Sequence, residues 1–241
     1  MTSRADSAAR RVSTWRSPAV RFGAGLWLAV GVAVPALAQS GSCGDLGNNY
    51  GPFDYRLDRS KLPIVERYHF TPQIEALVSG GTAAKVEDDI SYTLRAFPNH
   101  ARALAAVVRL AEREKSPHPK GLQYSVDCYF QRALRFRDDD TVVRMLYAQW
   151  LGKTNRRDVG VKQLDAIVPG DNPLTVYNLG LVYAELGKFD KALDLAHRAQ
   201  ALGDPRPSLR NILEKAGHWR DAPQPVPPVA ASAVGGPGAE R

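Results

Sequence analysis

Apolar residues recur at helical spacing over most of the chain, from residue 71 to about residue 216. The clearest pattern lies in segment 173–204, where Gly187 separates two apolar stripes. Asn172 and Pro173 place a capping side chain and a proline at the first helical position, which is typical of a helix start. The pattern predicts two antiparallel helices. Their apolar positions are Leu179, Val182, Tyr183 and Leu186 in the first helix and Phe189, Ala192, Leu193, Ala196 and Ala199 in the second.

Weaker versions of this pattern lie on both sides of the strong unit. In chain order, the expected helix pairs are 71–79 with 83–97, 99–114 with 122–136, and two helices within 141–172. The loop 115–121 is longer than the connection in the strong unit. A closing helix is expected over Pro207–Ala216, with Leu209, Ile212 and Leu213 directed inward. Together these units predict an all-α fold of stacked antiparallel helix pairs.

The strong unit carries a recognisable series of residues: Tyr177, Asn178, Leu179, Gly180, Tyr183, Gly187, Phe189, Ala192 and Ala199. This series resembles the tetratricopeptide repeat (TPR). Val176 departs from the pattern, because the repeat usually has tryptophan there, and Gly160 stands where the preceding unit should have alanine. The resemblance implies a right-handed superhelix of stacked helix pairs whose first helices line a concave groove.

The register implied by this resemblance assigns groove positions that bind a peptide or protein segment. In the TPR family, asparagine at the position of Asn178 often hydrogen-bonds the backbone of an extended peptide; the alternative is that Asn178 caps neighbouring backbone. Arg102, Arg109 and Lys153 are either receptors for a carboxylate or simply solvated. The expected groove residues are Asn99, Arg102, Arg109, Met145, Gln149, Lys153, Tyr177, Asn178, Leu181 and Glu185.

Residues 39–70 match no repeat unit and are expected to form an irregular, aromatic-rich arm along the first helices. A second resemblance, to exported repeat proteins of Gram-negative bacteria for which no activity is known, involves this arm. It rests on Cys-Gly-Asp-Leu at 43–46, Gly-Pro-Phe-Asp-Tyr-Arg at 51–56, Val65-Glu66, His-Phe-Thr-Pro at 69–72 and Tyr-Asn-Leu-Gly-Leu at 177–181.

Residues 1–38 match a secretory signal peptide. An arginine-rich leader precedes an apolar run of 13 residues from Phe22 to Val34, and Ala36-Leu37-Ala38 forms a small-x-small cleavage site. The prediction is cleavage after Ala38 and a periplasmic protein. An uncleaved inner-membrane anchor is the alternative, since Phe22 to Ala38 makes 17 residues and a spanning helix needs roughly 20.

The C-terminal segment 220–241 is rich in proline, alanine and glycine and has no periodic apolar positions. It is predicted to be disordered, with polyproline II character around Pro223–Pro228. The repeat domain is therefore expected to cover residues 71–219.

The net charge of +7 suggests a nucleic-acid partner only at first sight. Residues 1–38 hold five arginines and one aspartate, a net +4, which leaves +3 for the other 203 residues. A charge so small and so interspersed does not make a nucleic-acid footprint. We therefore expect no nucleic-acid partner.

Cys43 and Cys128 are the two cysteines of the chain, 85 positions apart. In an oxidising compartment they are each other's intramolecular partner, and the bridge would pin the arm onto the helical body. Such a loop closure stabilises by at most about 4–5 kcal/mol. The alternative is two reduced cysteines.

No catalytic constellation is found in the sequence. The five histidines are scattered, no pair has metal-ligand spacing, and no HExxH, GxSxG, P-loop or dinucleotide motif occurs. Glu87-Asp88-Asp89 and Asp138-Asp139-Asp140 are interpreted as helix-start residues. We therefore expect no metal site, no cofactor and no enzymatic activity.

The leading hypothesis is an exported TPR-like scaffold or adaptor that binds a peptide in its groove within a cell-envelope assembly. One alternative is a small-ligand-binding protein or enzyme whose pocket is walled by the arm and the 115–121 loop, motivated by the aromatic density of the arm. Another is a structural protein that self-assembles through its end repeats.

Overall fold

The structure, a computed structural model, describes residues 43–222, which all belong to one compact unit. The expected signal peptide at 1–38 and the tail from Pro223 onward lie outside the described residues. The described part is all-helical, with ten helices and no strand. The helices are α1 Leu62–His69, α2 Pro72–Glu75, α3 Val86–Ala96, α4 Ala101–Glu114, α5 Val126–Phe136, α6 Thr141–Lys153, α7 Arg157–Asp165, α8 Pro173–Glu185, α9 Phe189–Ala201 and α10 Ser208–Lys215.

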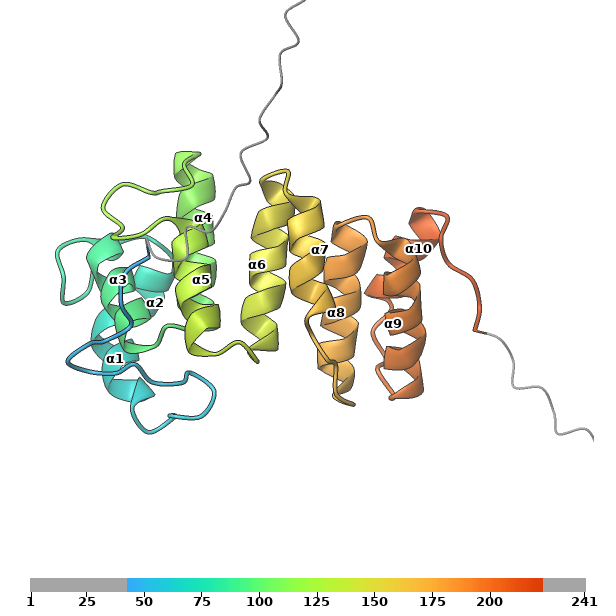
Figure 1. The fold of residues 1–241 in the computed structure, drawn as a ribbon, viewed down its shortest axis with the longest axis horizontal. Coiled ribbons are helices and arrows are strands. Elements are labelled where there is room, and N and C mark those ends of the chain that lie inside the picture. The colour runs from blue at the N-terminus through green and yellow to red at the C-terminus, as the bar shows by residue number, and fades with distance from the viewer. Residues whose placement is uncertain (1–42, 223–241) are drawn as a thin grey trace, which may run out of the picture. The chain divides into compact units, whose positions relative to one another are not determined.

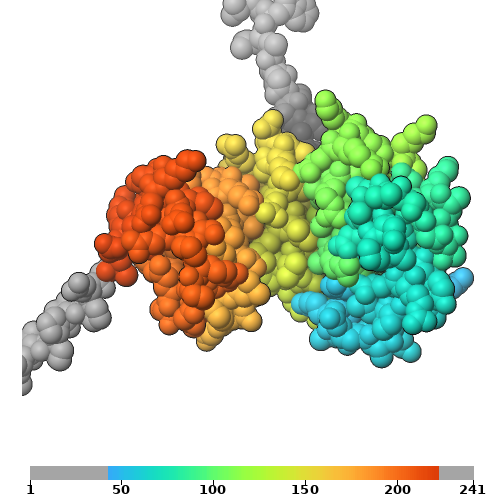
Figure 2. Space-filling view, turned by 180° about the vertical axis from the view of Figure 1, so that it is seen from behind, coloured from blue at the N-terminus to red at the C-terminus, as the bar shows by residue number. Residues whose placement is uncertain are grey.

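The helices from α4 onward follow one another as pairs (Figure 1). Helix α4 packs on α5, α6 on α7, and α8 on α9, while the first helices α4, α6 and α8 contact one another in sequence. Helix α10 closes one end against α8 and α9, and α1, α2 and α3 lie at the other end. Figure 2 shows the C-terminal and N-terminal helices on either side of the middle pair.

The helix pairs recur at nearly constant intervals. Helices α4, α6, α8 and α10 begin at residues 101, 141, 173 and 208, so their starts are separated by 40, 32 and 35 residues. The second helices α5, α7 and α9 begin at residues 126, 157 and 189, separated by 31 and 32 residues. The longer first interval arises because the loop between α4 and α5 is the longest connection within a pair.

Side chains define where these helices begin. Asn172 accepts a hydrogen bond from the backbone N–H of Thr175 at 3.0 Å, and Asp140 accepts one from Val143 at 3.1 Å. Each satisfies a donor that the first helical turn leaves unpaired. At the other end of α8, Gly187 adopts a φ of +74°, which favours glycine and turns the chain toward α9. The predicted start and end of this helix are confirmed.

Small residues allow the paired helices to approach closely. A Cβ on Gly160 would lie 2.9 Å from the carbonyl oxygen of Ala148 on α6. Glycine at this position, where the TPR pattern has alanine, therefore relieves a backbone contact between α6 and α7. At Gly180 of α8 the atoms closest to a Cβ would be side-chain atoms, 2.5 Å away at Leu209 Cδ2 of α10 and 3.2 Å away at Leu195 Cβ of α9.

Three expectations about the ends of the array are wrong. The arm is not irregular throughout, because α1 forms within it and buries Leu62 and Val65. The helix expected over 71–79 is a single turn, α2, and α3 begins three residues later than residue 83. Ile212 was expected to point inward, but it is 40% exposed. Leu209 and Leu213 already fill the buried face of α10, so Ile212 falls outside that face.

The arm is held against the C-terminal end of α3. The backbone N–H of Phe53 donates to the carbonyl oxygen of Ala96 at 2.8 Å, and Phe53 packs on Phe97 with ring centroids 5.5 Å apart. The backbone of Gly51 passes directly against the end of α3. Its φ is +104°, and a Cβ there would collide with the Ala96 carbonyl oxygen. The arm therefore needs glycine at this position.

We expect Gly51→Ala to lower the free energy of unfolding by about 2 kcal/mol, because the new methyl group combines backbone strain with overpacking. Urea denaturation measures the change. Gly47→Ala is the matched control, since a Cβ at Gly47 meets nothing within 4 Å. Equal stabilities for the two variants would contradict the arm geometry.

Candidate functional site

One face runs across the three first helices. Lys153 Nζ of α6 lies 2.6 Å from Glu112 Oε1 of α4, and Gln149 Nε2 donates to Glu185 Oε2 of α8 at 2.8 Å. On each helix, residues three, four or seven positions away from Glu112, Gln149, Lys153 or Glu185 lie on the same side as these four residues. We call this surface the first-helix face. Its members are Arg102, Arg109 and Glu112 of α4, Val142, Gln149 and Lys153 of α6, and Leu174, Asn178, Leu181 and Glu185 of α8.

The α4 part of the face is occupied by the protein's own acceptors. Arg102 forms ion pairs with Glu66 of α1 and Glu75 of α2, and its guanidinium lowers the pKa of Glu75. Arg109 donates to the backbone oxygen of Glu75 at 2.8 Å. Lys153 is paired with Glu112. The three cations, considered either as receptors for a carboxylate or as simply solvated, are therefore each engaged within the described chain.

The α6–α8 part of the face is apolar and exposed at the N-terminal ends of the two helices, whereas Gln149 and Glu185 bond each other further along. Val142 and Leu174 are 47% and 52% exposed, and Leu181 is half-buried against the core. Asn178 is also half-buried, and its side-chain amide forms no hydrogen bond with any of residues 43–222. This region therefore combines exposed aliphatic side chains with one amide whose donors and acceptor are free within the described structure. Met145 is also expected on the groove, but this expectation is wrong, because its side chain packs in the core beneath this region and is 7% exposed.

Tyr177 does not belong to the open face. It is buried, and the Arg206 guanidinium lies 3.8 Å from its ring centroid. Arg206 is held there by an ion pair with Asp204, in the segment that connects α9 to α10. The expectation that Tyr177 lines the groove is therefore wrong, because this connection covers its ring.

Asn99 was also expected on the groove, and this expectation is wrong. Its side chain is fully buried before the start of α4. Its amide nitrogen donates to Asp54 Oδ1 at 2.9 Å and to Asp140 Oδ2 at 2.8 Å, and its oxygen accepts from the Tyr55 N–H at 2.9 Å. Asn99 thus ties the arm to the starts of α4 and α6, and a ligand has no access to it.

Arg56, whose side chain is partly exposed, extends this network toward the surface. Its guanidinium bonds both carboxylate oxygens of Asp54 and also pairs with Asp139 and Asp140. Burial alone raises the pKa of Asp54, but the hydrogen bonds from Arg56 and Asn99 outweigh burial and lower the pKa to about 2. Asp54 was not recognised from the sequence: Arg56 lies only two positions away, but Asn99, which links Asp54 to the starts of α4 and α6, lies 45 positions away.

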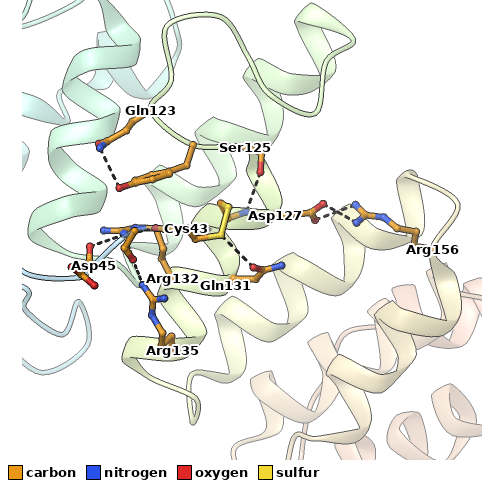
Figure 3. Close-up of a disulfide and its surroundings, with 12 residues drawn as sticks. Cys43, Asp45, Gln123, Ser125, Asp127, Gln131, Arg132, Arg135 and Arg156 are labelled. Carbon is orange, nitrogen blue, oxygen red and sulfur yellow. Dashed lines mark hydrogen bonds and ion pairs between the residues drawn. A yellow bond between two sulfur atoms is a disulfide. The ribbon is translucent and has the colours of Figure 1, made fainter. Parts of the chain in front are cut away.

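The Cys43–Cys128 disulfide is formed, with the two Cα atoms 5.3 Å apart, and it fastens the arm to α5 (Figure 3). Arg132, one turn further along α5, donates to the backbone oxygens of Cys43, Gly44 and Asp45 at 2.7, 3.1 and 2.8 Å. Arg132 is only 3% exposed, and burial lowers its pKa. Arg132 is the one charged residue among the buried positions of α5. A charged residue on an otherwise apolar helix face could have indicated from the sequence that it has a buried partner.

Two pockets lie in the region where the sequence suggested one. The arm pocket, of about 240 Å³, is lined by Tyr50, Ile64, Val65, Tyr68, His69, Thr82 and Tyr92. The loop pocket, of about 520 Å³, is lined by residues that include Glu112, Lys115, Pro117, Asp127, Trp150 and Arg156. The arm turns toward α3 and the 115–121 loop turns toward the end of α6, so the arm and the loop do not wall these pockets jointly.

Within residues 43–222, no group of three or more histidine, cysteine, aspartate or glutamate side chains is placed to hold a metal ion. No helix in this part of the chain is both long enough and apolar enough to cross a membrane. No model of a protein family, no curated protein and no solved structure matches the chain.

The low pKa of Asp54 predicts a measurable acid sensitivity. Its ordinary value is 3.8 and its folded value about 2, so its contribution is present above about pH 4 and is lost as the pH falls through 2. Between these limits, we expect wild type to lose about 2 kcal/mol more unfolding free energy than Asp54→Asn. Urea unfolding across a pH series measures this difference. Asp190→Asn, which removes an exposed carboxylate from α9, is the control, and parallel curves for wild type and Asp54→Asn would contradict the assignment.

Proposed function

We propose that this protein is an exported, non-enzymatic scaffold of the TPR type. In this proposal its first-helix face binds an extended peptide or protein segment, and it acts as an adaptor in a cell-envelope assembly. The observation that carries the proposal is the α6–α8 part of that face, where the exposed side chains of Val142 and Leu174 share a face with the unpaired amide of Asn178.

The TPR arrangement is supported by spacing and by residue classes together. The intervals of 32 and 35 residues between the starts of α6, α8 and α10 are close to the 34 residues of that repeat. The departures have local explanations, since Gly160 relieves a contact with α6 and the loop after α4 lengthens one unit. On this proposal, the pairs stack as a right-handed superhelix with the first helices on the concave side.

The chemistry of the open face favours an extended peptide. A peptide in extended conformation presents a backbone N–H and a C=O that an asparagine side chain can bond at the same time. Val142, Leu174 and Leu181 offer apolar area for its side chains on both sides of Asn178. The α4 cations are already paired, so we assign the peptide to the α6–α8 region and not to the α4 end.

We expect peptides selected from a random display library against the purified protein to bind Asn178→Ala about 5- to 10-fold more weakly than wild type. This factor corresponds to one lost hydrogen bond of about 1–1.4 kcal/mol. Fluorescence anisotropy with a labelled peptide measures it.

Asn211→Ala is the matched control, because Asn211 is an exposed asparagine on α10, away from the first-helix face. The proposal fails if no peptide is enriched, or if the enriched peptides bind the Asn178 and Asn211 variants equally well.

Export is supported by the leader sequence and by the disulfide, which is typical of oxidising compartments. We expect protein recovered from the envelope fraction to have an intact mass that begins at Gln39 and no thiol that can be labelled before reduction. An intact N-terminus with the bridge present would favour the inner-membrane anchor, whereas two free thiols would place the domain in a reducing compartment and refute the proposal on location.

A further inference from the structure

The arm pocket is an aromatic surface that the proposed peptide site does not use. Tyr50 of the arm, Tyr68 of α1 and Tyr92 of α3 contribute three phenol rings, and Ile64 lies one helical turn before Tyr68. Ile64 and Tyr68 are 55% and 50% exposed, so the pocket opens to solvent. No lysine, arginine, aspartate or glutamate belongs to its lining. An occupant without charge would therefore leave water at the least cost.

Buried contacts hold the Tyr92 wall of the pocket in place before anything binds. Asp89 is fully buried and accepts hydrogen bonds from the N–H groups of Gly81 and Ala83, and it lies 2.8 Å from His69 Nδ1. Because this carboxylate is an acceptor, Nδ1 of His69 carries the hydrogen. The His69 ring stacks on the Tyr92 ring, with the two ring centroids 3.9 Å apart. A wall fixed in this way binds without a large ordering cost.

The other two tyrosines, Tyr50 and Tyr68, differ in whether their hydroxyls are already hydrogen-bonded. Tyr50 packs edge-on against Phe53 with centroids 5.0 Å apart, and its hydroxyl donates to the Lys61 carbonyl oxygen at 3.3 Å. The hydroxyls of Tyr68 and Tyr92 form no hydrogen bond with any residue that the structure describes. They can therefore donate to an occupant. Aromatic walls with phenol donors suit polyproline II segments, in which proline rings lie on aromatic faces and carbonyl groups accept hydrogen bonds.

The chain itself contains such a segment. Residues 223–228 read Pro-Gln-Pro-Val-Pro-Pro, and residues 222–239 contain no charged side chain. Four of these six residues are proline, which restricts the backbone in advance and supplies carbonyl acceptors without an N–H. The segment thus matches the arm pocket in ring content, in charge and in hydrogen-bonding groups.

The tail of the same copy is too short to reach the pocket. The arm pocket is built on α1 and α3, at the opposite end of the helix row from α10 (Figure 1). The three steps between first helices from α4 to α10 cover roughly 24–30 Å at 8–10 Å per step, and α3 lies beyond α4. Six residues in polyproline II conformation extend about 19 Å. The matching segment must therefore come from another molecule.

We propose that residues 223–228 of a second copy of this chain occupy the arm pocket and link copies head to tail. The contact is heterologous, because the pocket and the tail are different surfaces, so each copy keeps one free pocket and one free tail for further association. This contact is independent of peptide binding on the first-helix face.

Sedimentation velocity over a dilution series of the purified protein, with the tail intact through Arg241, tests the proposal. We expect wild type to form species larger than a monomer as its concentration rises. Tyr68→Ala should weaken association about tenfold, as should a tail variant with Pro225, Pro227 and Pro228 each changed to alanine. Tyr68 is half exposed, so its substitution leaves the core intact.

Mixing the two variants separates this contact from other modes of association. Only the tail of the Tyr68 variant and the pocket of the tail variant remain competent, so the mixture should form a heterodimer and nothing longer. Leu57→Ala is the control, because Leu57 is a 67% exposed apolar residue outside the pocket, and it should behave as wild type. The proposal is overturned if wild type stays monomeric, if the tail variant alone changes association, or if neither variant changes it.

Discussion

The buried amide of Asn99 is the interaction on which the arrangement of the N-terminal half depends. It bonds Asp54 of the arm and Asp140 at the start of α6, two segments that are far apart in the chain. Because Asp140 also caps α6, the same few hydrogen bonds set where the arm lies and where the middle helix begins. The positions of both candidate surfaces therefore depend on these hydrogen bonds, because α6 contributes part of the first-helix face and the arm contributes one wall of the arm pocket.

The sequence was informative wherever a local signal decides the structure. Asn172 and Gly187 bound a helix through a side-chain cap and a positive φ, and both effects act within a few residues. Helical spacing of apolar residues likewise placed the helix pairs. These features could be predicted because no distant partner is needed to specify them.

Prediction failed where a distant partner decides. Asn99 and Tyr177 were assigned to a groove by repeat register, but Asp54 and Arg206 take them out of it. The arm was expected to be irregular because it matches no repeat unit. Helix α1 has only eight residues and draws its stability from packing Leu62 and Val65 on the body, which the local sequence does not reveal. The order of residues in the chain carries little information on such long-range contacts.

The disulfide also bears on the order in which the molecule is completed during synthesis. Cys43 is made 85 residues before Cys128, so the arm exists as a chain with a free thiol until α5 has been made. Within the described chain, however, these two are the cysteines that can meet, and the sequence holds no third. Oxidation therefore has a single intramolecular product, the Cys43–Cys128 bridge. The arm cannot be trapped by a wrong disulfide, even if the Cys43 thiol stays reduced until α5 has been made.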